Sequence, residues 1–319
     1  MKKEKDEEIK EEILKEPETE ESGPDEAADK DAPEQRKRMK LGKGQIRLIL
    51  KIGMVFLLLM AVLSFYEIFQ LSNQYRESIR KYDQLESMIK VEETEGAVAS
   101  TRSLVADETS DEPVEEAEPS KIKLDIDVDF ASLRAINPDV MGWIYYAPLE
   151  ISYPVVVDRG DDYYEHYGFD LEKNVAGAIF LDYASRQDMQ SFNTIIYGHN
   201  MRNGTMFGSL KKLLSDTSII EGDPYFYVIT ENRIYMYEIF ADYTCRASAK
   251  TYDLKLTYTE DEMKEYLDYI ESVASYKRED FFKKGVSEDM KIATLSTCHG
   301  VNSGNRTVIH GELVETADR

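Results

Sequence analysis

Short runs of apolar and β-branched residues, separated by turn residues, dominate the chain from about residue 121 onward. Many such runs at close spacing predict a mainly β domain, either a barrel or a sandwich. The predicted strands are VMGWIYYA, ISYPVVV, GAIFLDY, FNTIIYGH, PYFYVIT, RIYMYEIFADYTCRA, KIATLST and RTVIHGELV.

Two stretches of the same region have a helical pattern instead. FASLRAINPD (130–139) predicts a short helix that Pro138 stops. In TYTEDEMKEYLDYIESVASY, apolar positions share one helical stripe, and Thr259 and Glu262 form a capping-box pattern. This second helix is inserted between the strand ending near Arg246 and the strand carrying Cys298. We expect it to pack on the side of a barrel.

A different apolar pattern precedes this domain. IGMVFLLLMAVLSFY (52–66) contains no charge, and flanking apolar residues extend it toward the ~20 residues of a membrane span. The basic run RKRMKLGKGQIRLILK precedes it, so the positive-inside rule places the N-terminus in the cytoplasm. A buried core helix is the alternative. A cleaved signal peptide fits poorly, because the preceding region is long and acidic and no A-x-A site follows.

These patterns predict four parts. Residues 1–45 form a disordered acidic cytoplasmic tail with a basic flank, since their composition cannot bury a core. Residues 46–69 form a transmembrane signal anchor. Residues 70–120 form a stalk, helical over 70–92, with an acidic linker after it. Residues 121–319 form an extracellular globular domain.

Charge, cysteine content and acidic-residue spacing limit which ligands and cross-links the chain can have. The 319 residues carry a formal net charge of −23, which argues against nucleic acid because phosphate binding needs a basic patch. Two cysteines permit at most one disulfide. The acidic stretch DRGDDYYEHYGFDLEKN does not have the spacing of an EF-hand loop, so we expect no metal site.

The candidate chemistry lies in KIATLSTCHGVNSGNRTVIHGEL (291–313). Cys298 ends a β-like run before a turn, and Arg306 begins the returning strand, where a guanidinium could stabilise a thiolate or an oxyanion. The alternative is a small buried cysteine and a surface arginine. Cys245, in an apolar strand without catalytic neighbours, fits the buried alternative well.

Four histidines compete as the base. His299 is adjacent to the cysteine and points to the opposite face of a regular strand. His310 lies four residues from Arg306 and suits packing within the barrel, whereas His166 lies in an acidic surface loop. His199 ends an apolar strand and enters a Gly/Asn-rich loop, as Cys298 does. The residues alone favour His199 only modestly.

TLSTC with an arginine eight residues on, YGHN about a hundred residues upstream, ISYPVVV and GAIFLDY together resemble the sortase family. The resemblance covers about residues 126–315. The long inserted helix is similar to that of class B sortases.

The resemblance implies a closed eight-stranded β-barrel with N-terminal helices. It implies that Cys298 is the nucleophile, His199 the acid/base and Arg306 the third active-site residue. It also implies a substrate groove, and no metal or organic cofactor. The groove residues are Tyr197, Asn200, Ser296 and Thr297. The long acidic tail and His299 depart from familiar members, and His299 leaves substrate preference near the cleft open.

The activity implied is that of a cysteine transpeptidase at the Gram-positive cell surface. It would cleave an NPxTx or LPxTG-like sorting motif of secreted proteins and transfer the acyl group to an amine of a lipid-linked peptidoglycan precursor. Three alternatives stay open: a pilus-polymerising sortase with a lysine acceptor, a simple cysteine endopeptidase, and a non-catalytic membrane-tethered binding module.

Overall fold

The N-terminal part of the described chain is one long helix, α2 (Lys43–Glu86). The computed structural model describes residues 42–93, 122, 124–160, 162–185, 188–298 and 304–319. Within these ranges, α2 is the helix long and apolar enough to cross a membrane. Large apolar side chains from Ile46 to Leu71 are exposed along it, and each CH₂ group left in water costs roughly 0.8 kcal/mol. This stretch makes α2 a candidate membrane span. Most of the predicted tail and the acidic linker lie outside the described residues.

The C-terminal turns of α2 pack on the globular domain, and residues from Val62 onward form one compact unit. The Tyr82 hydroxyl donates to the carbonyl oxygen of Gly177 at 2.5 Å. Lys81 forms a salt bridge with Asp170 at 2.7 Å. This part of the helix therefore braces the loop that leads to Gly177.

The helix predicted over 70–92 is too long by several residues. Helix α2 ends at Glu86, and β1 (Ile89–Glu93) pairs antiparallel with β2 (Leu124–Val128). The β-branched residues of IKVEE alternate with polar ones, which is the period of a strand. Pairing with β2 satisfies backbone groups that the helix would otherwise have satisfied, so tertiary context overrides helical spacing.

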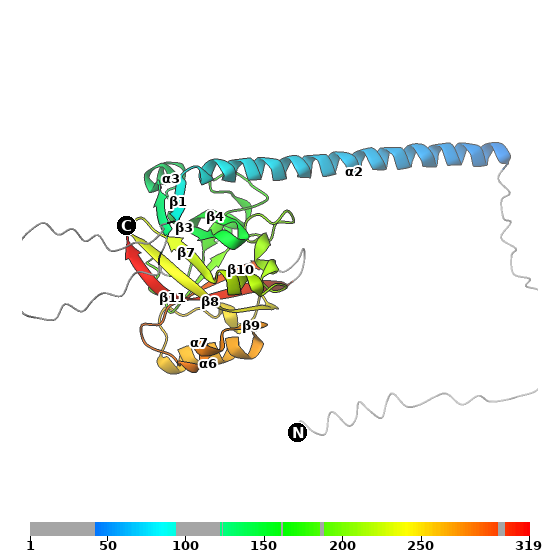
Figure 1. Ribbon diagram of the computed structural model, residues 1–319. Coiled ribbons are helices and arrows are strands. Elements are labelled where there is room, and N and C mark those ends of the chain that lie inside the picture. The colour runs from blue at the N-terminus through cyan, green and yellow to red at the C-terminus, as the bar shows by residue number, and fades with distance from the viewer. Residues whose placement is uncertain (1–41, 94–121, 123, 161, 186–187, 299–303) are drawn as a thin grey trace, which may run out of the picture. The chain divides into compact units, whose positions relative to one another are not determined.

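All eight predicted strands are present, and they close into a barrel. Around the ring the order is β11-β10-β6-β5-β4-β3-β7-β8, and β8 pairs with β11 to close it. The short strand β9 (Tyr276–Lys277) adds to β8 outside the ring. Figure 1 shows the two longest strands, β8 and β11, side by side. The predicted closed eight-stranded barrel is thus confirmed. Its strands are β3 (Val140–Tyr146), β4 (Ile151–Val157), β5 (Ile179–Leu181), β6 (Asn193–Tyr197), β7 (Tyr225–Ile229), β8 (Arg233–Arg246), β10 (Ile292–Cys298) and β11 (Asn305–Asp318).

The inserted helix is α6 (Glu260–Val273), between β8 and β10 as predicted. Both hydrogen bonds of the Thr259–Glu262 capping box are present, a motif in which the cap alone contributes about 1 kcal/mol. The buried face of α6 packs with residues of β8 and α7 in a second apolar cluster, and Figure 1 shows α6 and α7 together on one flank of the barrel. The remaining helices are α3 (Phe130–Ile136), α4 (Tyr163–His166), α5 (Ser218–Gly222) and α7 (Glu279–Lys283), with 3₁₀ turns η1 (Ala147–Leu149), η2 (Gly208–Lys212) and η3 (Lys250–Tyr252).

His310 is part of the barrel core, as predicted. It is fully buried, and its ring nitrogens bond to the Thr294 hydroxyl at 2.8 Å and the Tyr243 hydroxyl at 2.9 Å. Burial lowers the pKa of His310 to about 3, because the low-dielectric interior disfavours the charged imidazolium. His310 is therefore neutral at physiological pH.

Candidate active site

Strand pairing brings three distant segments to one end of the barrel. Strands β10 and β11 are antiparallel, with Cys298 directly opposite Arg306. Strands β10 and β6 are parallel, with Ser296 beside Tyr197, and every pair in this register is 99 positions apart. The same offset separates His199 from Cys298, and each lies two residues past the last pair of this register, Ser296 and Tyr197.

A cavity of about 340 Å³ opens at this end of the barrel. Its lining includes five of the predicted site residues: Tyr197, His199, Ser296, Thr297 and Arg306. Asn200 is not among the described residues that line it, and its backbone instead forms an isolated bridge with Met206. Cys298 reaches this end of the barrel because its backbone pairs with that of Arg306, a residue of the cavity lining. His299 and most of the predicted turn lie outside the described residues.

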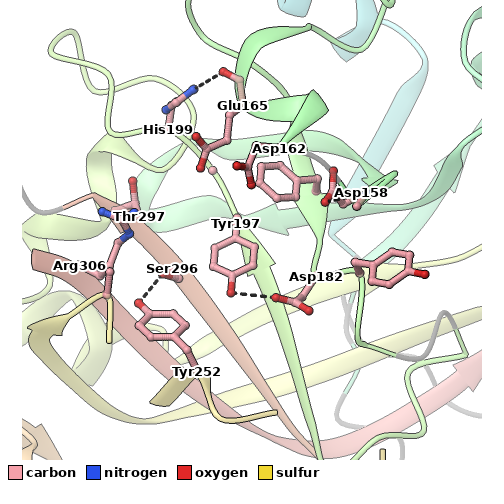
Figure 2. Close-up of a pocket in the computed structure, with 15 residues that line it drawn as sticks. Asp158, Asp162, Glu165, Asp182, Tyr197, His199, Tyr252, Ser296, Thr297 and Arg306 are labelled. Carbon is pink, nitrogen blue, oxygen red and sulfur yellow. Dashed lines mark hydrogen bonds between the residues drawn. The ribbon is translucent and has the colours of Figure 1, made fainter. Parts of the chain in front are cut away.

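The ring of His199 is held by a backbone group. Its Nε2 lies 2.6 Å from the carbonyl oxygen of Glu165, as the dashed line in Figure 2 marks. A carbonyl oxygen only accepts hydrogen bonds, so Nε2 carries the proton in the neutral ring. Nδ1 is then the nitrogen that gains or loses a proton.

Gly177 makes this contact possible. It has a φ of +54°, and a Cβ there would lie 2.5 Å from the carbonyl oxygen of Tyr164, 2.9 Å from Cδ2 of His199 and 3.0 Å from the carbonyl oxygen of Glu165. A side chain at this position would drive the histidine ring and the carbonyl apart. In the sequence, Gly177 is visible only as a glycine before strand β5. Its contacts with Tyr164, Glu165 and His199 appear only in the folded chain.

Two tyrosines form neutral hydrogen-bonding groups on the cavity wall. The Tyr197 hydroxyl donates to Asp182 at 2.9 Å, and the hydroxyls of Tyr252 and Ser296 lie 2.8 Å apart. Burial raises the pKa of both tyrosines, and the charge of Asp182 raises that of Tyr197 further. Sequence reasoning missed Asp182 and Tyr252. Asp182 directly follows the apolar run of β5, a position where a polar residue at a strand end could have been noticed.

The charges in the cavity are segregated. Figure 2 shows Arg306 beside Thr297 on one side and the carboxylates of Asp158 and Asp182 across the cavity, with Tyr197 between. Thr297 is 2% exposed, and its hydroxyl has no hydrogen-bond partner in the described structure. Because an unpaired buried hydroxyl costs roughly 1–3 kcal/mol, this group is suited to bonding a ligand.

The expectation that Cys245 lies away from the candidate catalytic residues is wrong. It lies directly opposite Arg306 on the β8 side of β11, so the two cysteines flank the arginine in one row of the sheet. Cys245 is half-buried, and burial raises the pKa of its thiol. A higher thiol pKa leaves less of the reactive thiolate at neutral pH.

Comparison with known proteins agrees with this barrel. The family model described as the sortase domain matches residues 148–314. Sortase B of Listeria monocytogenes is 34% identical over 190 residues, covering 58% of this chain and 74% of that protein. Sortase B of Staphylococcus aureus is 27% identical over 197 residues, covering 59% of this chain and 75% of that protein.

Solved structures give the same result. Sortase B from Bacillus anthracis, in a complex with AAEK1, superposes with a TM-score of 0.56 at 28% identity, covering 76% of this chain and 98% of that one. Sortase B from Clostridium perfringens gives a TM-score of 0.53 at 29% identity, covering 58% of this chain and all of that one (100%). Fold and matches together define a cysteine transpeptidase of the kind that anchors proteins to the cell wall. The chain belongs to the sortase family, and the relatives named here are sortase B proteins.

Proposed function

We propose that this chain is a membrane-anchored transpeptidase that cleaves an NPxTx or LPxTG-like sorting motif and joins it to an amine of a peptidoglycan precursor. One observation carries the proposal. Arg306 and His199 line one cavity, and the register of β10 with β11 sets the backbone of Cys298 opposite Arg306, which supports a shared site for the three residues. Residues that are far apart in the sequence thus supply a nucleophile, a cation and a proton carrier.

In the proposed mechanism, Cys298 attacks the threonine carbonyl of the sorting motif. Arg306 stabilises the oxyanion that develops on that carbonyl, a contribution worth about 10²–10³ in rate for comparable donors. His199 protonates the leaving amine from Nδ1, because Nε2 is occupied by the Glu165 carbonyl. A thioester then remains on Cys298, and an amine resolves it while His199 accepts the proton.

The cavity wall suits a peptide substrate. The hydroxyl of Thr297 is available to bond it, while Tyr197 and Ser296 present hydroxyls already oriented by Asp182 and Tyr252. Buried, pre-bonded hydroxyls lose little entropy on binding, which favours a fixed peptide register. Asn200 follows His199 and is proposed to shape the loop of the histidine.

Helix α2 is proposed to anchor the enzyme with its N-terminus in the cytoplasm and its barrel outside. The basic run before the apolar stretch supports this orientation. Secreted substrates and a lipid-linked acceptor both arrive at the outer face of the cell membrane, where such an anchor would hold the active site.

The change Gly177→Ala is expected to lower kcat by about 10- to 100-fold, part of the 10²–10⁴ that a positioned acid/base contributes. The added Cβ would separate His199 from the Glu165 carbonyl. The pH dependence of kcat should shift as well, because the ring loses its fixed tautomer. Gly222→Ala is the control, since a Cβ there meets nothing within 4 Å. A folded Gly177→Ala enzyme with wild-type kcat and pH profile would contradict this role.

The proposed function is tested with the full chain in detergent micelles, a sorting-peptide library and several amines. Mass spectrometry should show cleavage after threonine, a thioester adduct on the enzyme, and a ligated product with peptidoglycan-type amines. Cleavage without ligation would favour an endopeptidase, and preference for a lysine side chain would favour a polymerising sortase. If no peptide were cleaved and none formed an adduct, the result would favour a non-catalytic binding module.

A further inference from the structure

A second cavity, of about 620 Å³, lies beside the first. One wall is the C-terminal part of α2, from Gln74 to Lys81, and another is the segment 165–175. Glu165 and His199 line both cavities. The proposed acid/base therefore stands at the boundary between two separate binding spaces.

A transpeptidase must bring two different substrates to one histidine. If the sorting peptide occupies the cavity of Arg306 and Thr297, the acceptor amine needs a second approach to the thioester that also reaches His199. The second cavity offers such an approach, because His199 lines it as well.

The second cavity carries charges of both signs. Lys81 is engaged by Asp170 at 2.7 Å and Glu172 at 2.6 Å, so it serves to hold the wall together. Lys173 lines the cavity, is exposed, and forms no salt bridge with another described residue. Glu165, whose carbonyl oxygen bonds to His199, also lines the cavity and supplies a carboxylate there.

We propose that this second cavity binds the acceptor, and that the acceptor is a peptide carrying both a free amine and a carboxylate. Glu165 attracts the ammonium form to the boundary with His199, and Lys173 holds the carboxylate. This assignment rests on the proposed function, since it names the second substrate of that reaction.

The step at the boundary is an aminolysis. The acceptor arrives as an ammonium ion and loses one proton to water. The free amine then forms a C–N bond with the thioester carbonyl, and the C–S bond breaks. The electron pair of that bond leaves on the thiolate of Cys298. The proton released by the nitrogen passes to Nδ1 of His199, since Nε2 donates to the Glu165 carbonyl.

The position of the cavity along the chain also fits a lipid-linked acceptor. The wall from Gln74 to Lys81 belongs to the same helix, α2, whose earlier residues form the apolar stretch.

The test uses the full chain in detergent micelles, a cleavable sorting peptide, and two acceptors, triglycine and triglycinamide. Lys173→Glu is expected to lower kcat/KM for triglycine by about three- to tenfold at low salt, with a smaller effect at high salt. The effect on triglycinamide should be slight, because it lacks the carboxylate. Lys212→Glu makes the same charge change at an exposed residue that lines neither cavity and should alter nothing.

A second pair of variants tests whether the acceptor occupies the cavity, by filling the cavity with a large side chain. Val175→Trp, at a cavity residue 39% exposed, should shift products from ligation toward hydrolysis with both acceptors by about tenfold. Val273→Trp, at a residue 38% exposed on α6, should not. Thioester formation with the sorting peptide should be unaffected in all four variants.

Unchanged acceptor kinetics in Lys173→Glu and Val175→Trp would overturn the inference, and so would equal losses with triglycine and triglycinamide in Lys173→Glu. Failure of the proposed function looks different, because the wild-type chain would then form no thioester, or would form one that water resolves and no amine does.

Discussion

Replacing Cys298 with alanine is expected to abolish the thioester adduct and to lower turnover of a sorting peptide by at least about 10⁴-fold. Loss of a covalent nucleophile removes the whole two-step route, and the oxyanion and binding groups that remain give only residual catalysis. Intact-protein mass spectrometry measures the adduct, and product formation measures turnover.

Cys245→Ala is the matched control, because the chain has two cysteines and both lie opposite Arg306. Burial raises the pKa of the Cys245 thiol, which leaves less of its reactive thiolate at neutral pH, so this variant should keep turnover within about threefold. An adduct that persists in Cys298→Ala and disappears in Cys245→Ala would reverse the assignment. Full turnover by Cys298→Ala would exclude a cysteine mechanism.

Much of the barrel could be predicted because its strands have a local signal. Runs such as ISYPVVV and KIATLST are apolar on the side that the core covers, and turn residues separate them, so each strand is visible without its partners. The sequence signal for helix α6 is equally local, since its capping box and apolar stripe lie within one segment. No local signal predicts where α2 ends, because pairing with β2, some 35 residues on, decides the conformation of Ile89 and Val91.

The arrangement of the site depends on closure of the barrel, which no local pattern contains. The sequence around Cys245 contains no sign of its partner, because Arg306 lies 61 residues on and reaches it only when β8 pairs with β11. The carbonyl of Glu165 belongs to the backbone, so no residue type signals it. Only the family resemblance could single out His199 among four histidines, and the structure adds its fixed tautomer.

His199→Ala is expected to lower kcat/KM for the sorting peptide by about 10²–10⁴-fold, the contribution of a general acid/base. Protonation of the leaving amine is lost, while binding in the cavity of Arg306 and Thr297 is retained. The loss should therefore appear mainly in kcat and in the pH dependence of the rate. Single-turnover measurements of thioester formation with a sorting peptide provide the comparison.

His310→Gln separates this effect from a general loss of structure. Because burial lowers the pKa of folded His310 to about 3, the unfolded chain binds a proton at a higher pH than the folded chain does. His310 therefore reduces stability as the pH falls below ~6.5, and the variant should weaken that dependence while costing about 1–3 kcal/mol through disturbed hydrogen bonds. A histidine with so low a pKa carries almost no proton at neutral pH and cannot serve as the general acid. If folded His310→Gln nevertheless lost turnover as fully as His199→Ala, the proton carrier would have to be sought in the barrel core rather than at the boundary of the two cavities.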